Sequence, residues 1–436
     1  MKNLVNIFVV VIIIVLFGIN ICYIYMEEDS IFIPKIEENN NDRVYYGYFV
    51  DIYDCELKDN IVIKTKKNKY SCPVKIIKDK NEKKEINITV VGDLLFESPY
   101  YKAIDSGEDK ELYFNRVKKY FSSDDLSIGN MEVVIGNDEL EVSGDGYNFC
   151  APSYIGDLVN TLDFEVLSTA NNHSFDRGIL GIESTINYFR NNTDIVTVGT
   201  YNNEEERENY RILNINDINV GVLAYTYGTN QKINKDNKYM IGYYKDPYSR
   251  KFTDEYKELL KNEISKIKEK SDVVIVIMHW GKEFTYGINS EQEDIANYLN
   301  SLGVDVIVGS HSHNIQKIDV IGDEHKTLVF YSLGNFLSAD NDISRTPSGK
   351  EEFDNAYQIG LMGKFKIVEE NNGYRIDDVK SELIVNYFDV NMRNFELIPY
   401  NEYSKNYEES HYRYSYGLTR EFIDNMYSNV IDEKYR

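Results

Sequence analysis

Four of the six histidines in this chain lie in short motifs that follow apolar segments, and each segment has the length of a buried β-strand. The motifs are Ala-Asn-Asn-His, which ends at His173, Met-His-Trp-Gly around His279, and Gly-Ser-His-Ser-His, which contains His311 and His313. Neutral imidazole binds zinc, iron and manganese, and it can also carry a proton in a hydrolytic reaction. The motifs therefore predict a metal-binding or acid–base site where strand ends meet.

Two carboxylates occur in the same setting. Asp93 follows the segment Ile-Thr-Val-Val-Gly, and Glu132 ends the motif Gly-Asn-Met-Glu. Either residue alone is a weak signal, because an aspartate after a strand more often caps the next helix than binds a metal. Taken with the four histidines, however, they predict a metal-dependent hydrolytic site at one edge of a sheet.

The segment 170–178 is the most specific of these motifs. It places two amides, an imidazole and a carboxylate within seven residues, directly after an apolar strand. Such polar groups are costly to bury unless they are used. The side-chain oxygen of Asn172 can ligate a hard cation, and the adjacent His173 can donate a proton. The alternative is a polar turn that caps the helix predicted from Ile179.

The segments after the later predicted strands add further polar residues. Residues 273–278 form an unbroken apolar run before His279, and a similar run precedes the alternating pair His311 and His313. A His-x-His sequence can offer both imidazoles to neighbouring metals if the backbone turns between them. Residues 331–336 either close the site from the side or form a tight structural turn. Candidate substrate-binding residues beside these motifs are Asn130, Trp280, Glu283, Gln316 and Asn335.

From residue 86 onward, short apolar segments alternate with segments of helical periodicity, which is typical of an α/β domain. The predicted strands are 86–92, 126–130, 165–170, 195–198, 220–225, 273–279, 306–310 and 328–333. The predicted helices are 113–121, 154–162, 179–191, 253–268 and 290–302. Beyond about residue 370 the pattern is irregular and rich in tyrosine, and it predicts only a strand at 383–388 and an amphipathic helix at 419–431.

The composition limits the class of partner. The chain has 436 residues, 42% of them hydrophobic, and a formal net charge of −24. This hydrophobic fraction is sufficient for a substantial core. A protein that binds nucleic acid needs basic patches to contact phosphates, and no stripe of lysine and arginine interleaved with aromatics occurs here. Nucleic acid is therefore excluded as the expected partner.

The first thirty residues predict a membrane anchor. Residues 4–24 are almost wholly apolar and approach the ~20 residues that a helix needs to cross a bilayer. A cleaved signal peptide is the alternative, but no small-residue cleavage site follows the apolar run. Lys2 precedes the run and three acidic residues at 27–29 follow it, so the positive-inside tendency predicts a single-pass protein of the cell membrane with a cytoplasmic amino terminus and an extracellular main domain.

The predicted organisation has five parts. They are a transmembrane anchor at 1–26, a linker at 27–43, a small β-rich segment at 44–80, a main domain at 86–370, and a C-terminal extension with a strand and a helix at 371–436. The β-rich segment is expected to contain strands at 44–53, 60–65 and 73–77. Its two cysteines, Cys55 and Cys72, either form a disulfide outside the cell or stay reduced.

These motifs resemble one family in their order. The matching segments are 91–93, 129–132, 170–178, 279–283, 309–316 and 331–336. They are similar to the motifs of CapA-type proteins of poly-γ-glutamate capsule synthesis, whose catalytic-looking domain belongs to the calcineurin-like metallophosphoesterase superfamily. The resemblance covers roughly residues 86–340, about three-fifths of the chain.

The resemblance implies an α/β fold, namely a four-layer α/β/β/α sandwich, with two divalent metal ions (manganese, zinc or iron) where strand ends meet. Carried over residue by residue, it implies His173 as general acid and Asp176 as the residue that orients either His173 or an amide. The implied metal ligands are Asp93, Glu132, Asn172, His279, His311 and His313. Two departures put one metal subsite in doubt: the first strand lacks the usual Asp-x-His, and Glu132 stands where a bridging aspartate is usual.

Three functions remain open at this stage. The first is a surface protein that assists synthesis or export of a poly-γ-glutamate-type capsule, together with a ligase and membrane partners, as the resemblance implies. The second is a membrane-anchored phosphodiesterase or amidase that acts on an anionic polymer of the wall or capsule. The third is a non-catalytic binding protein that keeps the site for structure.

Overall fold

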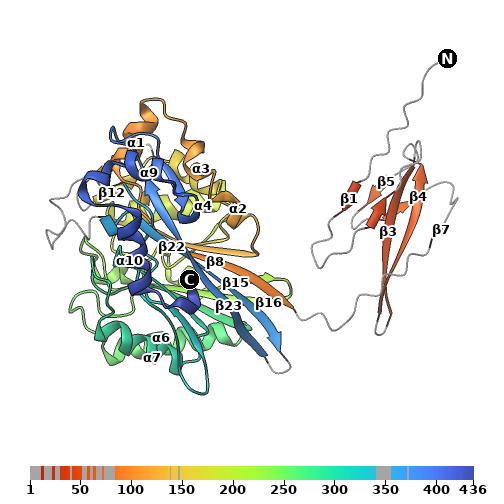
Figure 1. Ribbon diagram of the computed structural model, residues 1–436. Helices are drawn as coiled ribbons and strands as arrows, with labels where there is room; N and C mark the ends of the chain where they lie inside the picture. The colour runs from red at the N-terminus through yellow and green to blue at the C-terminus, as the bar shows by residue number, and fades with distance from the viewer. Residues whose placement is uncertain are drawn as a thin grey trace, which may run out of the picture. The chain divides into compact units, whose positions relative to one another are not determined.

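The structure is a computed structural model. It describes residues 84–137, 139–145, 148–339, 355–370 and 373–436, together with seven short strands within the first 83 residues. The chain divides into two compact units, Met1–Lys83 and Lys84–Arg436 (Figure 1).

The first unit contains only strands among its described residues. β1 (Val11–Ile13) pairs with β2 (Cys22–Ile24), and both lie within the segment predicted to cross the membrane. The rest of that segment lies outside the described residues. Among the residues that the structure does describe, no helix is long and apolar enough to span a bilayer.

Farther along the first unit, β3 (Ser30–Asn39) pairs with β4 (Asp42–Asp51), which also pairs with β7 (Ser71–Cys72). β3 occupies most of the segment predicted as a linker. Its sequence Ser-Ile-Phe-Ile-Pro-Lys-Ile is rich in β-branched and aromatic residues, which favours a strand. β5 (Glu56–Lys58) pairs with β6 (Val62–Lys64). The strand predicted at 73–77 lies outside the described residues.

The second unit contains two large sheets. One has the strand order β15-β16-β17-β18-β20-β19, in which the four central strands are parallel and both edges are antiparallel. Its strands are β15 (Arg211–Ile215), β16 (Ile218–Thr226), β17 (Val273–His279), β18 (Val306–Ser310), β19 (Ile318–Ile321) and β20 (Thr327–Phe330). Four of these strands lie where the sequence predicts them.

The other large sheet has the order β14-β13-β9-β8-β22-β23-β24, and β21 also pairs with β8. β8, β9, β13 and β14 are parallel, whereas β22, β23 and β24 are antiparallel. The bounds are β8 (Glu85–Leu94), β9 (Leu126–Met131), β13 (Val166–Ser168), β14 (Val196–Val198), β21 (Asn335–Leu337), β22 (Ile359–Glu370), β23 (Gly373–Tyr387) and β24 (Glu396–Pro399). The domain boundary predicted at residue 370 falls between β22 and β23, two paired strands of this sheet.

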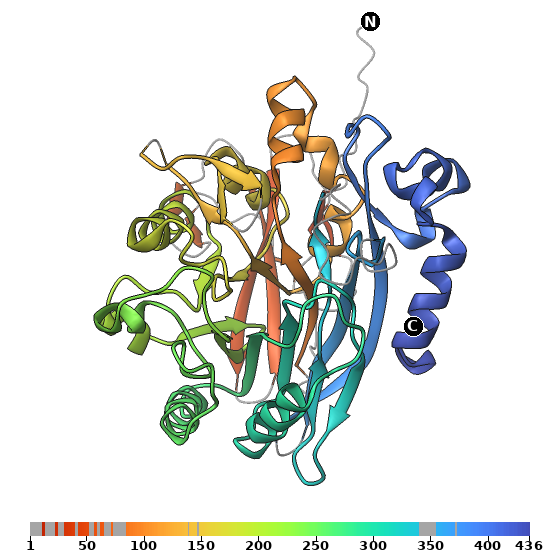
Figure 2. The same ribbon diagram turned by 90° about the vertical axis from the view of Figure 1, so that its left-hand side faces the viewer.

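Side chains alternate between two cores because successive residues of a strand face opposite sides. On β17, Ile275 and Ile277 face the core between the two sheets, whereas Val274 and Val276 face α6 and α7. On β8, Val90 faces the core between the sheets and Val91 faces the outer core. The order of layers is therefore helix, sheet, sheet, helix, with strands between the two groups of helices in Figure 2.

The helices of one outer layer are α6 (Asp254–Lys268) and α7 (Ser290–Ser301). The other layer contains α1 (Ser98–Asp105), η2 (Lys110–Phe114), α2 (Lys118–Phe121), α3 (Tyr154–Asn160) and part of α4 (Gly178–Asn192). Where one helix is predicted at 113–121, two short ones form. A small third sheet consists of β10 (Val134–Ile135), β11 (Ser143–Asp145) and β12 (Asn148–Ala151).

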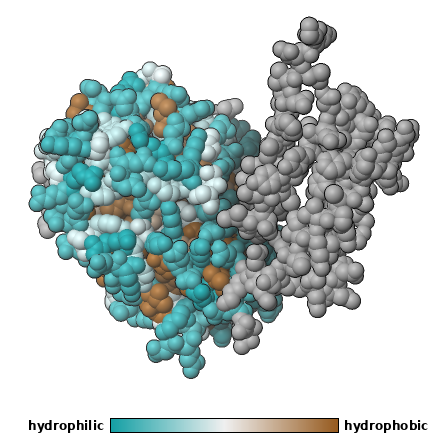
Figure 3. Space-filling view, turned by 45° about the vertical axis from the view of Figure 1, so that its right-hand side comes forward, coloured by the Kyte–Doolittle hydropathy of each residue, from teal (hydrophilic) through white to brown (hydrophobic). Residues whose placement is uncertain are grey.

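The remaining elements lie in connections and at the C-terminus. They are α5 (Glu204–Glu208), η3 (Lys235–Met240), η5 (Tyr400–Glu402), α9 (Lys405–Ser410), η6 (Tyr412–Tyr416), α10 (Arg420–Val430) and η7 (Glu433–Tyr435). α10 lies within the predicted helix 419–431, and Ile423 and Met426 join the core between the sheets. The face of the second unit in Figure 3 is mainly hydrophilic, with small separate hydrophobic patches.

Candidate metal centre

The parallel strands of both sheets deliver polar residues to one place. Asp93 near the end of β8 is paired with Asn130 of β9, and His279 at the end of β17 is paired with Ser310 of β18. The two sheets are joined here, because the backbone N–H of His311 donates to Oδ2 of Asp93 at 3.1 Å. The strand ends of two sheets therefore form one polar site inside the sandwich.

Asp93 is fully buried and is held on several sides. Its Oδ1 accepts a hydrogen bond from Nδ2 of Asn130 at 2.7 Å and lies 3.8 Å from Nδ1 of His279. Its Oδ2 lies 3.5 Å from Nδ1 of His313. The carboxylate is thus fixed among two of the histidines that the sequence singles out.

Glu132 is buried beside Asp93 without a cationic partner of its own. Neither of its carboxylate oxygens accepts a hydrogen bond, and Oε1 lies 3.4 Å from Nε2 of His279. Burial, and then the charge of Asp93, raise the pKa of Glu132 well above its ordinary value. Two acids buried side by side, one of which accepts no hydrogen bond, need a bound cation or a proton.

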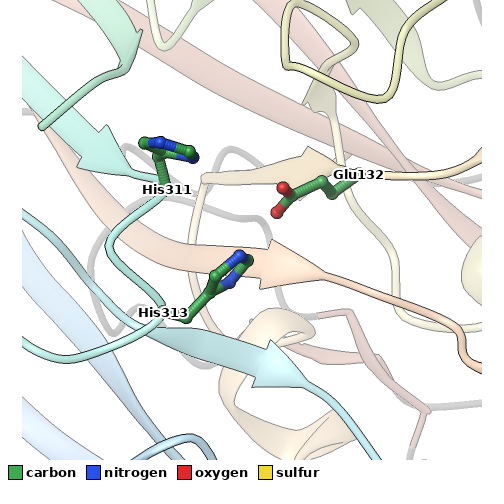
Figure 4. A group of neighbouring side chains, drawn as sticks. All are labelled: Glu132, His311 and His313. Atoms are coloured by element: carbon green, nitrogen blue, oxygen red, sulfur yellow. The ribbon is translucent and has the colours of Figure 1, made fainter. Parts of the chain in front are cut away.

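His311 and His313 face Glu132 because the chain turns sharply between them. Both residues have left-handed backbone torsions, φ +89° and +54°. This turn brings both imidazoles to the same side, toward the Glu132 carboxylate (Figure 4). The ligand atoms of Glu132, His311 and His313 lie within 4.8 Å of one another, and so do those of Asp93, Glu132 and His279.

His279 lies between the two sheets' ligands. Its Nε2 lies 2.6 Å from Oδ1 of Asn172, and its Nδ1 lies 2.9 Å from Oγ of Ser310. Burial, and then the neighbouring His311 and His313, lower the pKa of His279 well below its ordinary value. Burial lowers the pKa of His311 in the same way. Both imidazoles are therefore neutral at physiological pH and keep the lone pair that a metal needs.

His173 and Asp176 form a pair beside these ligands. Nδ1 of His173 lies 2.6 Å from Oδ2 of Asp176, and the same oxygen accepts the backbone N–H of Phe149 at 2.7 Å. The ring of Phe149 packs edge-on against the imidazole, 4.6 Å between centroids. The carboxylate fixes the proton on Nδ1, so Nε2 is the nitrogen available for chemistry.

The donor set fits divalent metal ions of the first transition row. It combines neutral imidazoles, carboxylates and one amide oxygen, which suit manganese, iron or zinc. Among the six predicted metal ligands, the buried side-chain atoms without a hydrogen-bond partner are Glu132 Oε1, Glu132 Oε2 and His311 Nδ1. A cation between them would satisfy all three. The six predicted ligands are thus brought together in one site.

A protein-family model with the description "Bacterial capsule synthesis protein PGA_cap" matches residues 87–340. The chain belongs to this family. The matched residues include all thirteen site residues predicted from the sequence, and the predicted resemblance to CapA-type capsule proteins is confirmed.

Two curated relatives support the family. The "PGA biosynthesis protein CapA" of Bacillus subtilis (strain 168) is 27% identical over 256 residues, which are 58% of this chain and 63% of the relative. The "Capsule biosynthesis protein CapA" of Bacillus anthracis is 27% identical over 263 residues, 59% of this chain and 60% of the relative. The chain therefore matches about three-fifths of the length of both relatives.

The chain is also similar to a solved structure, that of TT1561 of Thermus thermophilus. The two align with a TM-score of 0.33 and 9% sequence identity, over 64% of this chain and 93% of that one.

Two of the predicted substrate-binding residues, Asn130 and Asn335, contact predicted metal ligands. Asn130 donates to Asp93 and accepts from Nδ2 of Asn171 at 3.2 Å. Oδ1 of Asn335 lies 2.8 Å from Nδ1 of His313, and its Nδ2 donates to the carbonyl of Tyr357 at 3.0 Å. Both amides are thus engaged with predicted metal ligands, and binding of substrate by them stays a prediction.

Two more of the predicted substrate-binding residues, Trp280 and Gln316, do not reach the site. Trp280 is fully buried in the core beneath α6 and α7, where its indole N–H donates to the Tyr331 carbonyl at 2.9 Å. Gln316 is also buried, and its amide donates to the carbonyls of Thr285 and Gly287 at 3.0 and 3.1 Å. Gln316 therefore holds a loop. Glu283 is half-buried, and its charge contributes to the raised pKa of Glu132.

Several residues of the site were not predicted. Tyr227 lies just after β16 and stacks on His279, with 6.3 Å between ring centroids and an interplanar angle of 11°. Asn230 places Nδ2 3.4 Å from Nε2 of His173. Their position in the sequence, directly after a predicted strand, could have identified both residues. Because β16 is parallel to β17, the loop after β16 must reach the same edge of the sheet.

Proposed function

We propose that this PGA_cap protein acts in synthesis or export of a poly-γ-glutamate-type capsule, and that its strand-end site is a metal-dependent hydrolytic centre. The observation that carries the proposal is the buried Glu132 carboxylate, which accepts no hydrogen bond and faces His279, His311 and His313. Such a group is stable only if a cation or proton occupies the space between the ligands.

The residues that would hold two divalent cations are Asp93, Glu132, Asn172, His279, His311 and His313. When bound, such cations lower the pKa of water and neutralise negative charge that develops on the substrate. Three of these side chains, Asp93, His279 and His313, are held in turn by Asn130, Ser310 and Asn335 through the hydrogen-bond contacts described above. Residues of this kind tune affinity for a metal without touching it.

His173 is the proposed general acid. Asp176 keeps a proton on Nδ1 and fixes the ring, so that Nε2 can hold a proton and give it to the leaving group. Asp176 acts through His173 and is a positioning residue. A protein that only bound polymer would have no use for this pair, which favours hydrolysis over simple binding.

The proposed location is the outer face of the cell membrane, with residues 4–24 as the anchor. The apolar run and the acidic residues that follow it support this placement. The proposed partners are a ligase and membrane proteins of capsule synthesis, because the relatives are named for capsule biosynthesis. Hydrolysis of a phosphodiester or amide in wall or capsule material is the alternative activity of the same site.

The test uses the full chain in detergent, loaded with manganese or zinc. Metal content is measured first, and then cleavage of γ-glutamyl oligomers and of a phosphodiester is assayed with wild type, His173→Ala and His325→Ala. His325 lies outside the site, where Nε2 contacts the carbonyl of Val304 at 2.8 Å, and serves as the matched control. Loss of cleavage with His173→Ala alone supports the proposal. Absence of bound metal from the wild type contradicts it.

A further inference from the structure

The loop after β16 forms one wall of the metal centre. Besides stacking on His279, the ring of Tyr227 lies 4.5 Å from that of His311. Three residues later, the backbone N–H of Asn230 donates to the carbonyl of Asn172 at 2.8 Å. The loop therefore contacts three of the proposed ligands, and Asn230 also touches the proposed acid.

Arg250 holds this loop through two backbone carbonyls and one ring contact. Its Nη1 donates to the carbonyl of Tyr227 at 3.1 Å, and its Nη2 donates to the carbonyl of Thr229 at 2.9 Å. Its guanidinium lies 5.1 Å from the centroid of the Tyr227 ring. Gly228 makes room for it, because a Cβ there would lie 1.5 Å from Nη1. These contacts thus fix the position of the guanidinium beside the Tyr227–Asn230 loop.

The backbone that presents Arg250 is strained. Its φ is +57°, a left-handed conformation that residues with a Cβ rarely adopt. The preceding turn enforces it: Oδ1 of Asp246 accepts the N–H groups of Tyr248 and Ser249 at 2.9 and 2.6 Å. Strain of this kind is retained where the surrounding structure fixes it, commonly at ligand sites.

Arg250 keeps an uncompensated charge. It is exposed, and in the part of the chain that the structure describes no carboxylate pairs with it within 4.0 Å. Its neighbour Lys245 is different, because Nζ lies 2.5 Å from Oε1 of Glu291. The Tyr227 ring connects Arg250 to the centre, because it contacts the guanidinium and also the His311 ring. In a chain with net charge −24, this is a local positive point.

We infer that Arg250 is the anion-recognition residue of the site and binds an oxyanion of the substrate, a carboxylate or a phosphate, beside the metal ligands. Two N–H groups hold the Tyr227–Asn230 loop, and among the described residues the other N–H groups of the guanidinium make no hydrogen bond, so they can offer a planar fork to an oxyanion. The inference rests on the proposed function, because it deepens the assignment of this site to an anionic substrate.

The experiment measures equilibrium binding of two inert probes to the full chain by calorimetry, with and without manganese. One probe is a short γ-glutamate oligomer that the protein does not cleave over the titration, and the other is inorganic phosphate. Arg250→Gln is expected to weaken binding of the recognised probe by about 10- to 100-fold. Arg250→Lys keeps the charge but lacks the fork, so it should recover only part of the affinity.

The matched control is Arg211→Gln. Arg211 also donates to a backbone carbonyl, that of Asn209 at 2.7 Å, but it lies on the edge strand β15. The Arg211→Gln variant should bind both probes with the affinity of the wild type. Equal affinities of wild type and Arg250→Gln for both probes would overturn the inference, and so would an equal loss in Arg211→Gln, which would indicate a general effect of charge.

A second variant moves the guanidinium and leaves its charge. Gly228→Ala should displace Arg250 and weaken probe binding as Arg250→Gln does, with thermal unfolding as the check on folding. The outcomes separate the two proposals. If the chain binds a probe through Arg250 but binds no metal and hydrolyses no substrate, only the proposed function is refuted. Metal-dependent hydrolysis with an unchanged KM in Arg250→Gln refutes only the role of Arg250.

Discussion

Oδ1 of Asn172 lies 2.6 Å from Nε2 of His279, although the two residues are 107 positions apart in the sequence. Nε2 of His279 also lies 3.4 Å from Oε1 of Glu132. Three atoms that can ligate a metal thus converge on one small space from three different strand ends. Hydrogen bonding alone does not account for this arrangement, because His279 can donate from Nε2 to only one of the two oxygens.

Asn172→Ala should weaken metal binding by at least about tenfold, because even residues that only orient ligands change affinity by ~10- to 100-fold. The backbone carbonyl of Asn172 still accepts from Asn230, so the loop should stay folded. Equilibrium dialysis against manganese or zinc measures the change. An unchanged affinity would show that the amide oxygen is not a ligand.

Glu132→Gln should lower the affinity for metal and raise the stability of the metal-free protein. The variant loses an anionic ligand, so metal binding should fall by at least about tenfold. It also relieves two acids buried side by side, so the metal-free protein should unfold at a higher temperature than metal-free wild type. Calorimetric unfolding in the presence of a chelator measures the second effect. A lower unfolding temperature of the metal-free variant would contradict this interpretation.

Removal of metal from the wild type should lower its stability. A ligand that binds only the folded state contributes about 2.7 kcal/mol when its free concentration is 100 times Kd. Unfolding by urea with manganese or zinc and then with excess chelator measures the difference. Glu132→Gln serves as the control, because its stability should respond less to the chelator. Identical curves for the wild type under both conditions would indicate that no metal binds at the site.

The site can be predicted from the sequence because its polar residues lie at the ends of predicted strands. Asp93, His279 and His311 each follow an apolar run, and parallel strands bring such positions to one edge. Trp280 could also have been excluded from the site. It shares the helix-facing side of the chain with Met278, whereas His279 faces the opposite side, as the period of two along a strand requires.

Other features depend on contacts that no local pattern contains. Asn130 and Asn171 meet because β9 and β13 are neighbours, and Gln316 meets Gln292 only through the fold. The second half of β23 lies in the strand predicted at 383–388, whereas its first half escaped prediction for another reason. Residues 373–380 of β23 are exposed or half-exposed, so this part of the strand is polar and carries no run of apolar residues.

Asp176→Asn should lower turnover by about 100-fold or more, the usual contribution of a general acid, while metal content stays that of the wild type. His173 and the N–H of Phe149 both contact Oδ2 of Asp176, and the amide oxygen of asparagine can take that place only without the negative charge of the carboxylate. The double variant with His173→Ala should be no slower than His173→Ala alone, because Asp176 acts through His173. Independent, multiplying losses would contradict that role.

His411 makes stability depend on pH independently of the metal centre. It is buried, its Nε2 lies 2.9 Å from the carbonyl of Asn386, and its Nδ1 accepts the N–H of Arg413 at 2.9 Å. Chiefly because of burial, its pKa is lowered to about 4. The unfolded side chain titrates near ~6.5. Between these values the unfolded protein binds a proton that the folded protein does not.

The folded state should therefore lose stability as the pH falls from about 6.5 toward 4, and His411 should account for about 3 kcal/mol of that loss. His411→Gln keeps one donor and one acceptor but cannot titrate. Urea unfolding of both proteins at several pH values, with chelator present, gives the difference between them, in which the acids common to both cancel. The free energy of unfolding of the wild type should decrease more steeply as the pH is lowered. Parallel pH profiles would mean that His411 does not titrate differently in the folded and unfolded states.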